Sequence, residues 1–147
     1  LGSNVGNRLY YLQQAVDLLK TRYLKGIKCS IVLETESIVP DNSPIEWNKP
    51  FLNMVVAGTS DLSPEILLQK LKTLEHEMGR ALVYERWAPR VIDLDILLCD
   101  NIVIDTPGLK IPHPELNNRP FLQHLLAMMG FYRKNQYTEK CFLKSYA

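Results

Sequence analysis

The stretch "RWAPRVIDLDILLC" (residues 86–99) decides the fold. It joins a basic segment containing Trp and Pro to a short apolar run, residues 91–99, whose length and aliphatic composition favour a strand. Side chains alternate between the two faces of a strand. One face therefore carries only apolar residues and should lie under helices: Ile92, Leu94, Ile96 and Leu98. The other face carries two acids among apolar neighbours: Val91, Asp93, Asp95 and Leu97.

The two acids, Asp93 and Asp95, are expected to have Cα atoms roughly 7 Å apart. Two like charges this close need a compensating cation, which Arg86, Arg90 or a metal ion can supply. One interpretation is an exposed sheet face whose acids pair with arginines. The other is a Mg²⁺ site, because Mg²⁺ is held by one or two carboxylates plus substrate phosphates. Acids on a strand facing arginines on loops suit phosphoryl transfer.

Three helices are predicted outward from this strand. The strongest signal lies just before it, where Ser63 can cap the helix, Pro64 suits its first turn and Gly79 ends it. Its apolar stripe is Leu67, Leu71, Leu74 and Met78. A turn-rich start, "LGSNVGN", precedes a helix that should end near residues 23–26, with a stripe of Leu9, Leu12, Val16 and Leu19. Residues 121–129 predict the third helix.

Strands are predicted at residues 27–38 and 51–60, and residues 101–105 look like a hairpin partner of residues 91–99. Three loops separate these elements: residues 39–50, 80–90 and 106–120. The order favours an α+β fold, a ferredoxin-like split βαβ sandwich, with helices on one face of an antiparallel sheet and the long loops forming the site. We expect one domain at residues 1–129 with a shortened first strand, and a tail or linker at 130–147.

Composition excludes several classes of protein. The 147 residues are 46% hydrophobic and 22% charged, with a net charge of +1, so no global basic field points to nucleic acid. No apolar run approaches the ~18 residues of a membrane span. The cysteines, Cys29, Cys99 and Cys141, have no CxxC spacing, which favours free thiols in a reducing cytoplasm over a disulfide framework or zinc site.

The segment "RWAPRVIDLDIL" resembles the signature of the 6-hydroxymethyl-7,8-dihydropterin pyrophosphokinase family. That signature is a basic residue, any residue, Gly or Ala, Pro, Arg, two free positions, Asp-apolar-Asp and two aliphatic residues. The segments "LGSN", "FLNMV", "GR" (residues 79–80) and "PHPELNNRPF" (residues 112–121) resemble further motifs of the family in the same order. The resemblance covers about residues 1–127.

The resemblance implies transfer of the βγ-pyrophosphoryl group of ATP to the hydroxymethyl oxygen of a dihydropterin, with release of AMP, in folate biosynthesis. Asp93 and Asp95 would hold two Mg²⁺ ions, and together with Arg80 and Arg90 they would carry the catalysis. The ATP-binding residues it implies are Arg80, Trp87, Arg90, Ile96, His113 and Arg119. Trp87 lies on a loop that would fold over bound ATP.

Thr35, Phe51, Asn53 and Phe121 would bind the pterin, with the two rings stacking on it and Asn53 reading its amide-like edge. For Phe51 and Phe121 simple core packing is the alternative. The sequence departs from the family pattern after Thr35, where the loop is longer and more acidic. It also has Leu82 and Pro114 where the family can carry arginine and tyrosine.

The expected partners are therefore ATP and a dihydropterin, with no nucleic acid and no membrane, and a fusion to dihydropteroate synthase fits this family. A rival hypothesis is a catalytically silent or regulatory ferredoxin-like domain of a multifunctional folate enzyme. An RNA-binding module of the same fold would need aromatic residues beside basic ones on its central strands, and "FLNMVVAG" lacks that pattern.

Overall fold

The computed structural model describes residues 1–131 and 144–146 of the chain. Its helices are α1 (Arg8–Arg22), α2 (Pro64–Glu77) and α3 (Pro120–Met128), with short 3-10 turns at Ile45–Trp47 and Pro114–Leu116. The strands are β1 (Gly2–Ser3), β2 (Lys25–Cys29), β3 (Val32–Thr35), β4 (Phe51–Asn53), β5 (Val56–Thr59), β6 (Ile104–Asp105), β7 (Lys110–Ile111) and β8 (Lys144–Tyr146). Most of the predicted tail, residues 132–143 and 147 and so Cys141, lies outside the described residues.

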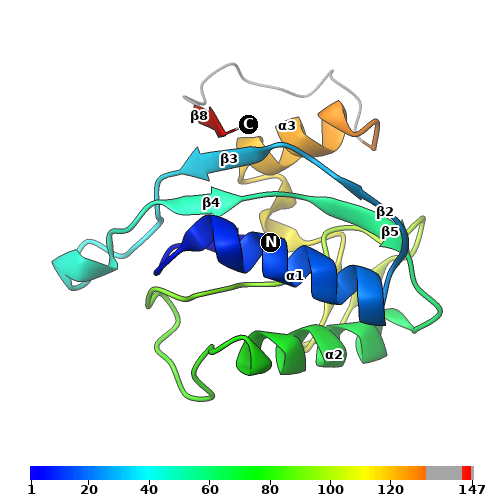
Figure 1. The fold of residues 1–147 in the computed structure, drawn as a ribbon, viewed down its shortest axis with the longest axis horizontal. Helices are drawn as coiled ribbons and strands as arrows, with labels where there is room; N and C mark the ends of the chain where they lie inside the picture. Colours follow the sequence, from blue (N-terminus) through cyan, green and yellow to red (C-terminus); the bar gives the residue numbers. More distant parts are fainter. Residues whose placement is uncertain (132–143, 147) are drawn as a thin grey trace.

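The main sheet has the strand order β1-β4-β3-β8, and every neighbouring pair is antiparallel. Strands β2 and β5 form a second antiparallel pair that continues the β3–β4 ribbon (Figure 1). The ribbon is interrupted where Ser30 N–H donates to the Val55 carbonyl (2.9 Å) and Val55 N–H donates to Ser30 Oγ (2.8 Å). The predicted strands at 27–38 and 51–60 are thus confirmed, each broken once.

The helices begin where the sequence provides a cap. Ser63 Oγ accepts from Ile66 N–H at the start of α2, and the Asn7 side chain accepts from Tyr10 N–H at the start of α1. Helix α2 ends at Glu77, and Gly79 follows with φ of +103°, a conformation that favours glycine. The predicted helices are confirmed, although Leu9 is exposed rather than part of the core stripe of α1.

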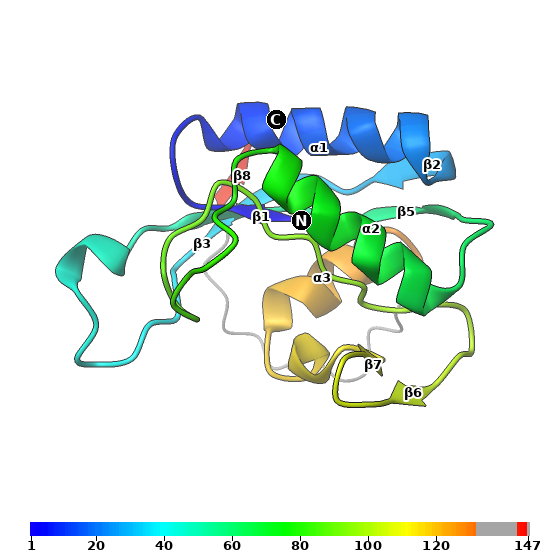
Figure 2. The same cartoon turned by 90° about the horizontal axis from the view of Figure 1, so that it is seen from below.

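The core lies in two layers on opposite faces of the main sheet. One cluster joins α1 and α2 to Leu52 of β4, and the other joins α3 to Leu33 of β3. Leu33 pairs with Asn53 in the β3–β4 ladder, whereas Leu52 pairs with Glu34, so Leu33 and Leu52 point to opposite faces. Figure 2 shows α3 on the other side of the sheet from α1. The expectation that the helices share one face is therefore wrong for α3.

Residues 91–99 lie beside β1 but form only one bridge, between Gly2 and Asp93. Ile92 and Leu94 are fully buried beneath α1 and α2, as the alternating pattern predicted. The predicted continuous strand is wrong because side chains of α2 take the backbone groups that a neighbouring strand would use. Glu75 accepts from Leu94 N–H (2.6 Å), and Lys72 Nζ donates to the Leu94 carbonyl (2.8 Å).

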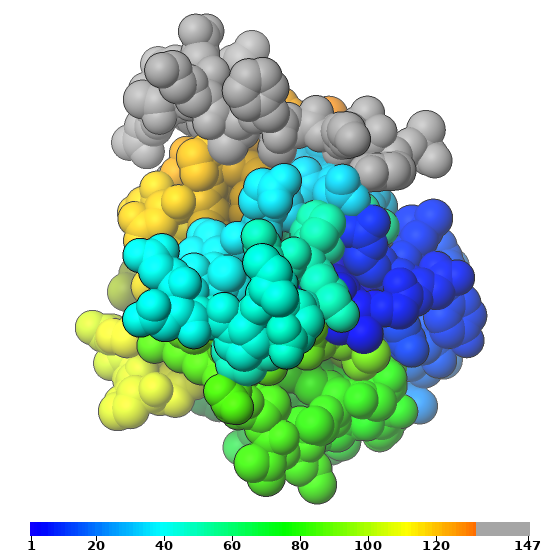
Figure 3. All heavy atoms as spheres, turned by 90° about the vertical axis from the view of Figure 1, so that its left-hand side faces the viewer, coloured from blue at the N-terminus to red at the C-terminus, as the bar shows by residue number. Residues whose placement is uncertain are grey.

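The predicted hairpin partner of this segment pairs elsewhere. A turn does occur where Ile102 N–H donates to the Cys99 carbonyl, but β6 pairs with β7 instead of residues 91–99. The loops at residues 36–50 and 80–90 project from the same end of the molecule (Figures 1 and 3). Across the described part of the chain, no helix is long and apolar enough to cross a membrane.

Candidate active site

An ionic cluster connects α2, the loop after it and residues 93–95. Asp93 Oδ1 accepts from Arg80 (2.6 Å), and its Oδ2 lies 3.1 Å from Arg90 Nε. Asp95 Oδ1 lies 3.3 Å from Lys72 Nζ, which is also 3.9 Å from Asp93. The cluster balances three acids against three bases: Glu75, Asp93, Asp95, Lys72, Arg80 and Arg90.

Glu75 is the buried centre of this cluster, with a side chain only 2% exposed. Its Oε1 accepts from Leu94 N–H (2.6 Å) and Lys72 (2.8 Å), and its Oε2 accepts from Arg80 (2.6 Å). Three donors on one carboxylate, two of them cationic side chains, favour its ionised form. Sequence reasoning missed Glu75 and Lys72 as site residues, although their i, i+3 spacing on α2, shortly before Arg80, would place both on one helix face.

Burial and charge act in opposite directions on these groups. Burial disfavours ionised Asp93, but the charges of Arg90, Lys72 and Arg80 outweigh it and hold the pKa of Asp93 below its usual value. Burial raises the pKa of Glu75, and the attraction of Lys72 offsets only part of that effect. Burial alone would lower the pKa of Lys72, yet Asp95 and Glu75 raise it overall. The lysine therefore stays charged beside the acids.

The basic loop places its arginines between the acids and aromatic rings. Arg80 has a side chain 6% exposed and stacks over Tyr84 at 4.3 Å from the ring centre. Arg90 is half-buried, and its guanidinium lies 5.5 Å from the ring centre of Phe51. Arg86 instead stacks on Trp87 (4.9 Å), so the acid pair is compensated by Arg90 rather than by Arg86. Arg90 thus connects the acid pair to the predicted pterin side.

The predicted pterin residues lie on the face of the main sheet opposite α1. Asn53 Nδ2 donates to Thr35 Oγ1 (2.8 Å), which leaves the Asn53 amide oxygen and one N–H for a ligand. Thr35 pairs with Phe51 in the β3–β4 ladder, so their side chains share this face. Gly2 of β1 approaches closely, because a Cβ at this position would lie 2.9 Å from Asn53 Oδ1 and 3.4 Å from Phe51.

The segment after β7 carries the remaining predicted site residues, His113, Arg119 and Phe121. His113 N–H donates to the Leu97 carbonyl (2.9 Å), and His113 Nδ1 accepts from Glu115 N–H (3.2 Å). Arg119 Nε lies 3.4 Å from Glu115, and Phe121 sits in the first turn of α3. The backbone bond to Leu97 fixes this segment against the one that carries the aspartates.

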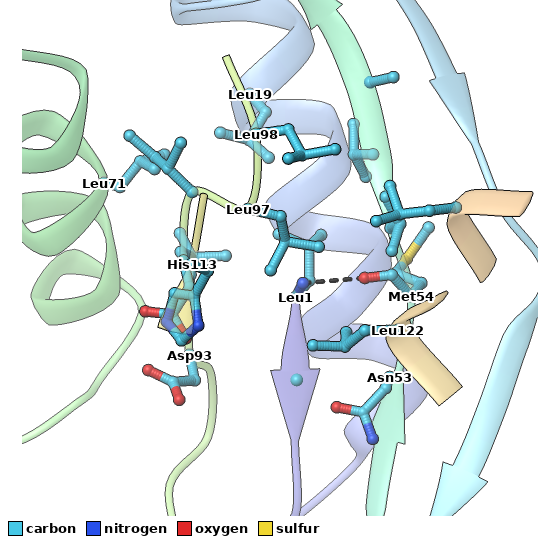
Figure 4. A pocket seen from close by; sticks show the side chains of 18 of the residues that line it. Leu1, Leu19, Asn53, Met54, Leu71, Asp93, Leu97, Leu98, His113 and Leu122 are labelled. Atoms are coloured by element: carbon cyan, nitrogen blue, oxygen red, sulfur yellow. Dashed lines mark hydrogen bonds between the residues drawn. The ribbon is translucent and has the colours of Figure 1, made fainter. Parts of the chain in front are cut away.

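One pocket of about 760 Å³ collects nearly all of the predicted site residues. Its lining includes Thr35, Phe51, Asn53, Trp87, Arg90, Asp93, Asp95, Ile96, His113, Arg119 and Phe121. Figure 4 shows the polar side chains of Asp93 and Asn53 toward one end of the pocket and Leu19, Leu71 and Leu98 toward the other. Arg80 is absent from this lining but donates to Asp93, which does line the pocket.

The acid pair supplies oxygen atoms of the kind that a hard divalent cation prefers. Asp93 and Asp95 both line the pocket, and the Asp95 side chain is 44% exposed, so oxygen donors face the space where a ligand would lie. Within the described residues, no group of three or more His, Cys, Asp or Glu side chains is arranged to hold a metal. An ion at Asp93 and Asp95 would complete its coordination with water or substrate oxygens, as Mg²⁺ commonly does.

The fold and this pocket define a class of small α+β domain in which a pair of carboxylates lies beside basic side chains. A family model described as 7,8-dihydro-6-hydroxymethylpterin-pyrophosphokinase (HPPK) matches residues 1–130, and the chain belongs to this family. This agrees with the resemblance seen in the sequence motifs.

Curated relatives are of two kinds. The chain is 41% identical over 129 residues to the folate synthesis bifunctional protein of Chlamydia caviae, covering 88% of this chain and 29% of that protein. It is 41% identical over 126 residues to the 2-amino-4-hydroxy-6-hydroxymethyldihydropteridine pyrophosphokinase of Aquifex aeolicus (86% and 74% covered). The Bacillus subtilis protein of that name is 40% identical over 128 residues (86% and 73%). The chain thus spans less than a third of its bifunctional relative.

Proposed function

We propose that this domain transfers the βγ-pyrophosphoryl group of ATP to the hydroxymethyl group of 6-hydroxymethyl-7,8-dihydropterin and releases AMP. The observation that carries the proposal is that one pocket joins the acid pair at Asp93 and Asp95 to the Asn53–Thr35 hydrogen bond. The family membership and the names of the relatives agree with this activity.

The reaction needs two substrates held close together. The hydroxymethyl oxygen bonds to the β-phosphorus, and the bond from that phosphorus to the oxygen bridging the α-phosphorus breaks. AMP leaves with the bridging oxygen, and the hydroxyl proton passes to solvent. Because the chemistry is mainly positioning and charge stabilisation, the residues that hold both substrates supply most of the catalysis.

On the pterin side, Asn53 offers its amide to the edge of the heterocycle while Thr35 fixes its orientation. Phe51 and Phe121 line the same pocket and offer ring faces for stacking. Arg90 lies over Phe51 and beside Asp93, so it stands where the two substrates would meet.

On the nucleotide side, Arg90, His113 and Arg119 line the pocket and would bind phosphate oxygens, and Ile96 and Trp87 would contact the rest of ATP. Arg80 would hold Asp93 in place and reach the phosphates when the 80–90 loop closes. Asp93 and Asp95 would hold Mg²⁺, two ions in this proposal, which when bound neutralises phosphate charge and acidifies the attacking hydroxyl.

A ferredoxin-like arrangement of the sheet is part of the proposal. It is supported by the spatial order of residues 91–95, β1, β4 and β3, all antiparallel, which is the order expected for the split βαβ sandwich. Residues 1–129 would form the domain, acting in the cytoplasm, with 130–147 as a tail or linker. The bifunctional relatives favour a place in a larger folate-synthesis protein, for instance one fused to dihydropteroate synthase.

The test is a product assay with ATP, Mg²⁺ and 6-hydroxymethyl-7,8-dihydropterin. AMP should form only when all three are present, and ADP in its place would refute the pyrophosphoryl transfer. Asp95→Asn should lower the rate by at least about 100-fold because it removes one proposed metal ligand. Asp61→Asn removes an exposed acid paired with Lys25 and should leave the rate unchanged.

A further inference from the structure

The ammonium of Lys72 lies beside the acid pair. Its Nζ lies 3.3 Å from Asp95 Oδ1 and 3.9 Å from Asp93 Oδ1. The same nitrogen donates to Glu75 Oε1 and to the Leu94 carbonyl, each at 2.8 Å. One flexible side chain from α2 therefore contacts both carboxylates that are proposed to bind Mg²⁺.

The ionic cluster defined above has no surplus negative charge, because its three acids face three bases. A divalent ion at Asp93 and Asp95 is attracted by the two carboxylates but repelled by the bases held against them, so part of the attraction is cancelled. For free Mg²⁺ to bind at Asp93 and Asp95, one of the bases must move away.

Lys72 is the base that can leave at the lowest cost. Its side chain is 38% exposed, whereas those of Arg80 and Arg90 are 6% and 18% exposed. Arg80 is also held by Glu75 and stacks on Tyr84. When Lys72 moves into solvent, Glu75 keeps its bonds to Arg80 and Leu94, so the segment that carries the aspartates remains in place.

We propose that Lys72 is a resident counter-ion of the acid pair, which a divalent cation must displace in order to bind. The inference rests on the proposed function of Asp93 and Asp95 and adds a specific consequence. The free ion binds weakly because the protein supplies its own competing cation, and the site gains metal affinity when nucleotide phosphates bring further negative charge.

The test measures binding of free Mn²⁺, as a paramagnetic substitute for Mg²⁺, without nucleotide. Electron paramagnetic resonance of unbound Mn²⁺ gives the dissociation constant for the whole chain. Lys72→Gln should tighten Mn²⁺ binding by about tenfold or more, because a unit charge about 4 Å from the site is removed. Lys72→Arg should keep the weak binding. Lys70→Gln is the matched control, since it removes the same charge from an exposed position of α2.

The double variant Lys72→Gln with Asp95→Asn should lose the gain, because the tightening depends on the freed carboxylate. Equal Mn²⁺ affinity in wild type and Lys72→Gln, even with a changed melting temperature, would overturn the inference and leave Lys72 as a structural tether between α2 and Leu94. The outcome of the AMP assay is independent of the outcome of the Mn²⁺ binding measurement. A protein that forms no AMP yet binds Mn²⁺ more tightly as Lys72→Gln would refute the activity and retain the counter-ion.

Discussion

Glu75 accepts a hydrogen bond from the backbone N–H of Leu94 at 2.6 Å, so a helix side chain fixes the segment that carries both aspartates. Asp93 and Asp95 are the residues before and after Leu94. Anchoring the Leu94 peptide therefore helps to position both of their side chains. The acid pair is therefore positioned from α2 as well as from its single bridge to β1.

Replacing Glu75 should destabilise the domain. Glu75→Gln keeps the size of the side chain but leaves Arg80 and Lys72 without their shared buried carboxylate, which should cost about 3 kcal/mol of unfolding free energy. Glu77→Gln, two residues later, removes only a surface ion pair with Arg22 and should cost less than about 1 kcal/mol. Urea unfolding of both variants measures the difference. Equal losses would show that Glu75 has no central role.

The lowered pKa of Asp93 predicts a specific acid sensitivity. A carboxyl whose folded pKa lies below its unfolded value stabilises the protein above that unfolded value, and the contribution is lost as pH falls through the folded pKa. The free energy of unfolding of the wild type should therefore decrease as the pH is lowered below about 4. The free energy of unfolding of Asp93→Asn should decrease less over the same range. The raised pKa of Glu75 acts in the opposite sense, because protonating this carboxyl favours the folded state, so the loss of stability in acid is assigned to Asp93.

Urea unfolding at a series of pH values from 7 to 3 checks this dependence. The plots of unfolding free energy against pH for wild type and Asp93→Asn should approach each other as the pH is lowered. Parallel curves would mean that Asp93 titrates alike in the folded and unfolded states.

Removing the Asn53 amide should act on the pterin and leave the nucleotide unaffected. Asn53→Ala should lower kcat/KM for the pterin by about 10- to 100-fold, the effect of leaving one or two ligand hydrogen bonds unmade. The KM for ATP should stay within about twofold, since Asn53 bonds to Thr35 and to none of the ionic cluster. Steady-state kinetics with each substrate varied in turn separate the two constants. Asn101→Ala, at an exposed turn, is the control.

The buried side chains of Ile92 and Leu94 should dominate stability at that edge of the sheet. Leu94 has no exposed surface, and Leu94→Ala should cost about 2–5 kcal/mol through lost contacts and a cavity. Ile45 is 86% exposed in the 36–50 loop, and Ile45→Ala should change stability by less than about 0.5 kcal/mol. Thermal unfolding ranks the two. A small loss for Leu94→Ala would contradict the packing described here.

The local signals of the sequence were sufficient for the helices. Ser63 and Pro64 mark the start of α2, and the spacing of Leu71 and Leu74 places its buried face correctly. The alternation of residues 91–95 also separated the buried Ile92 and Leu94 from the acids. These features depend on periodicity and capping, which are encoded within a few residues.

The errors concern bonds between distant residues. No local pattern shows that Glu75 and Lys72 would occupy the backbone groups of Leu94, so residues 91–99 were predicted to continue as a strand and to pair with residues 101–105. The pairing of β6 with β7 and the packing of α3 on the second face are likewise tertiary choices. The predicted site residues meet in one pocket, but their roles in binding and catalysis stay predictions.

The glycine at position 2 has a consequence for how this domain can change its sequence. Its missing side chain makes room for the Asn53 amide and the Phe51 ring, because a Cβ there would lie 2.9 Å from Asn53 Oδ1. A larger residue at position 2 is compatible with the pocket only if position 53 shrinks at the same time. Position 53 can therefore shrink on its own, whereas position 2 can enlarge only together with a change at position 53, and a designer who reshapes this pocket for a different heterocycle should change both.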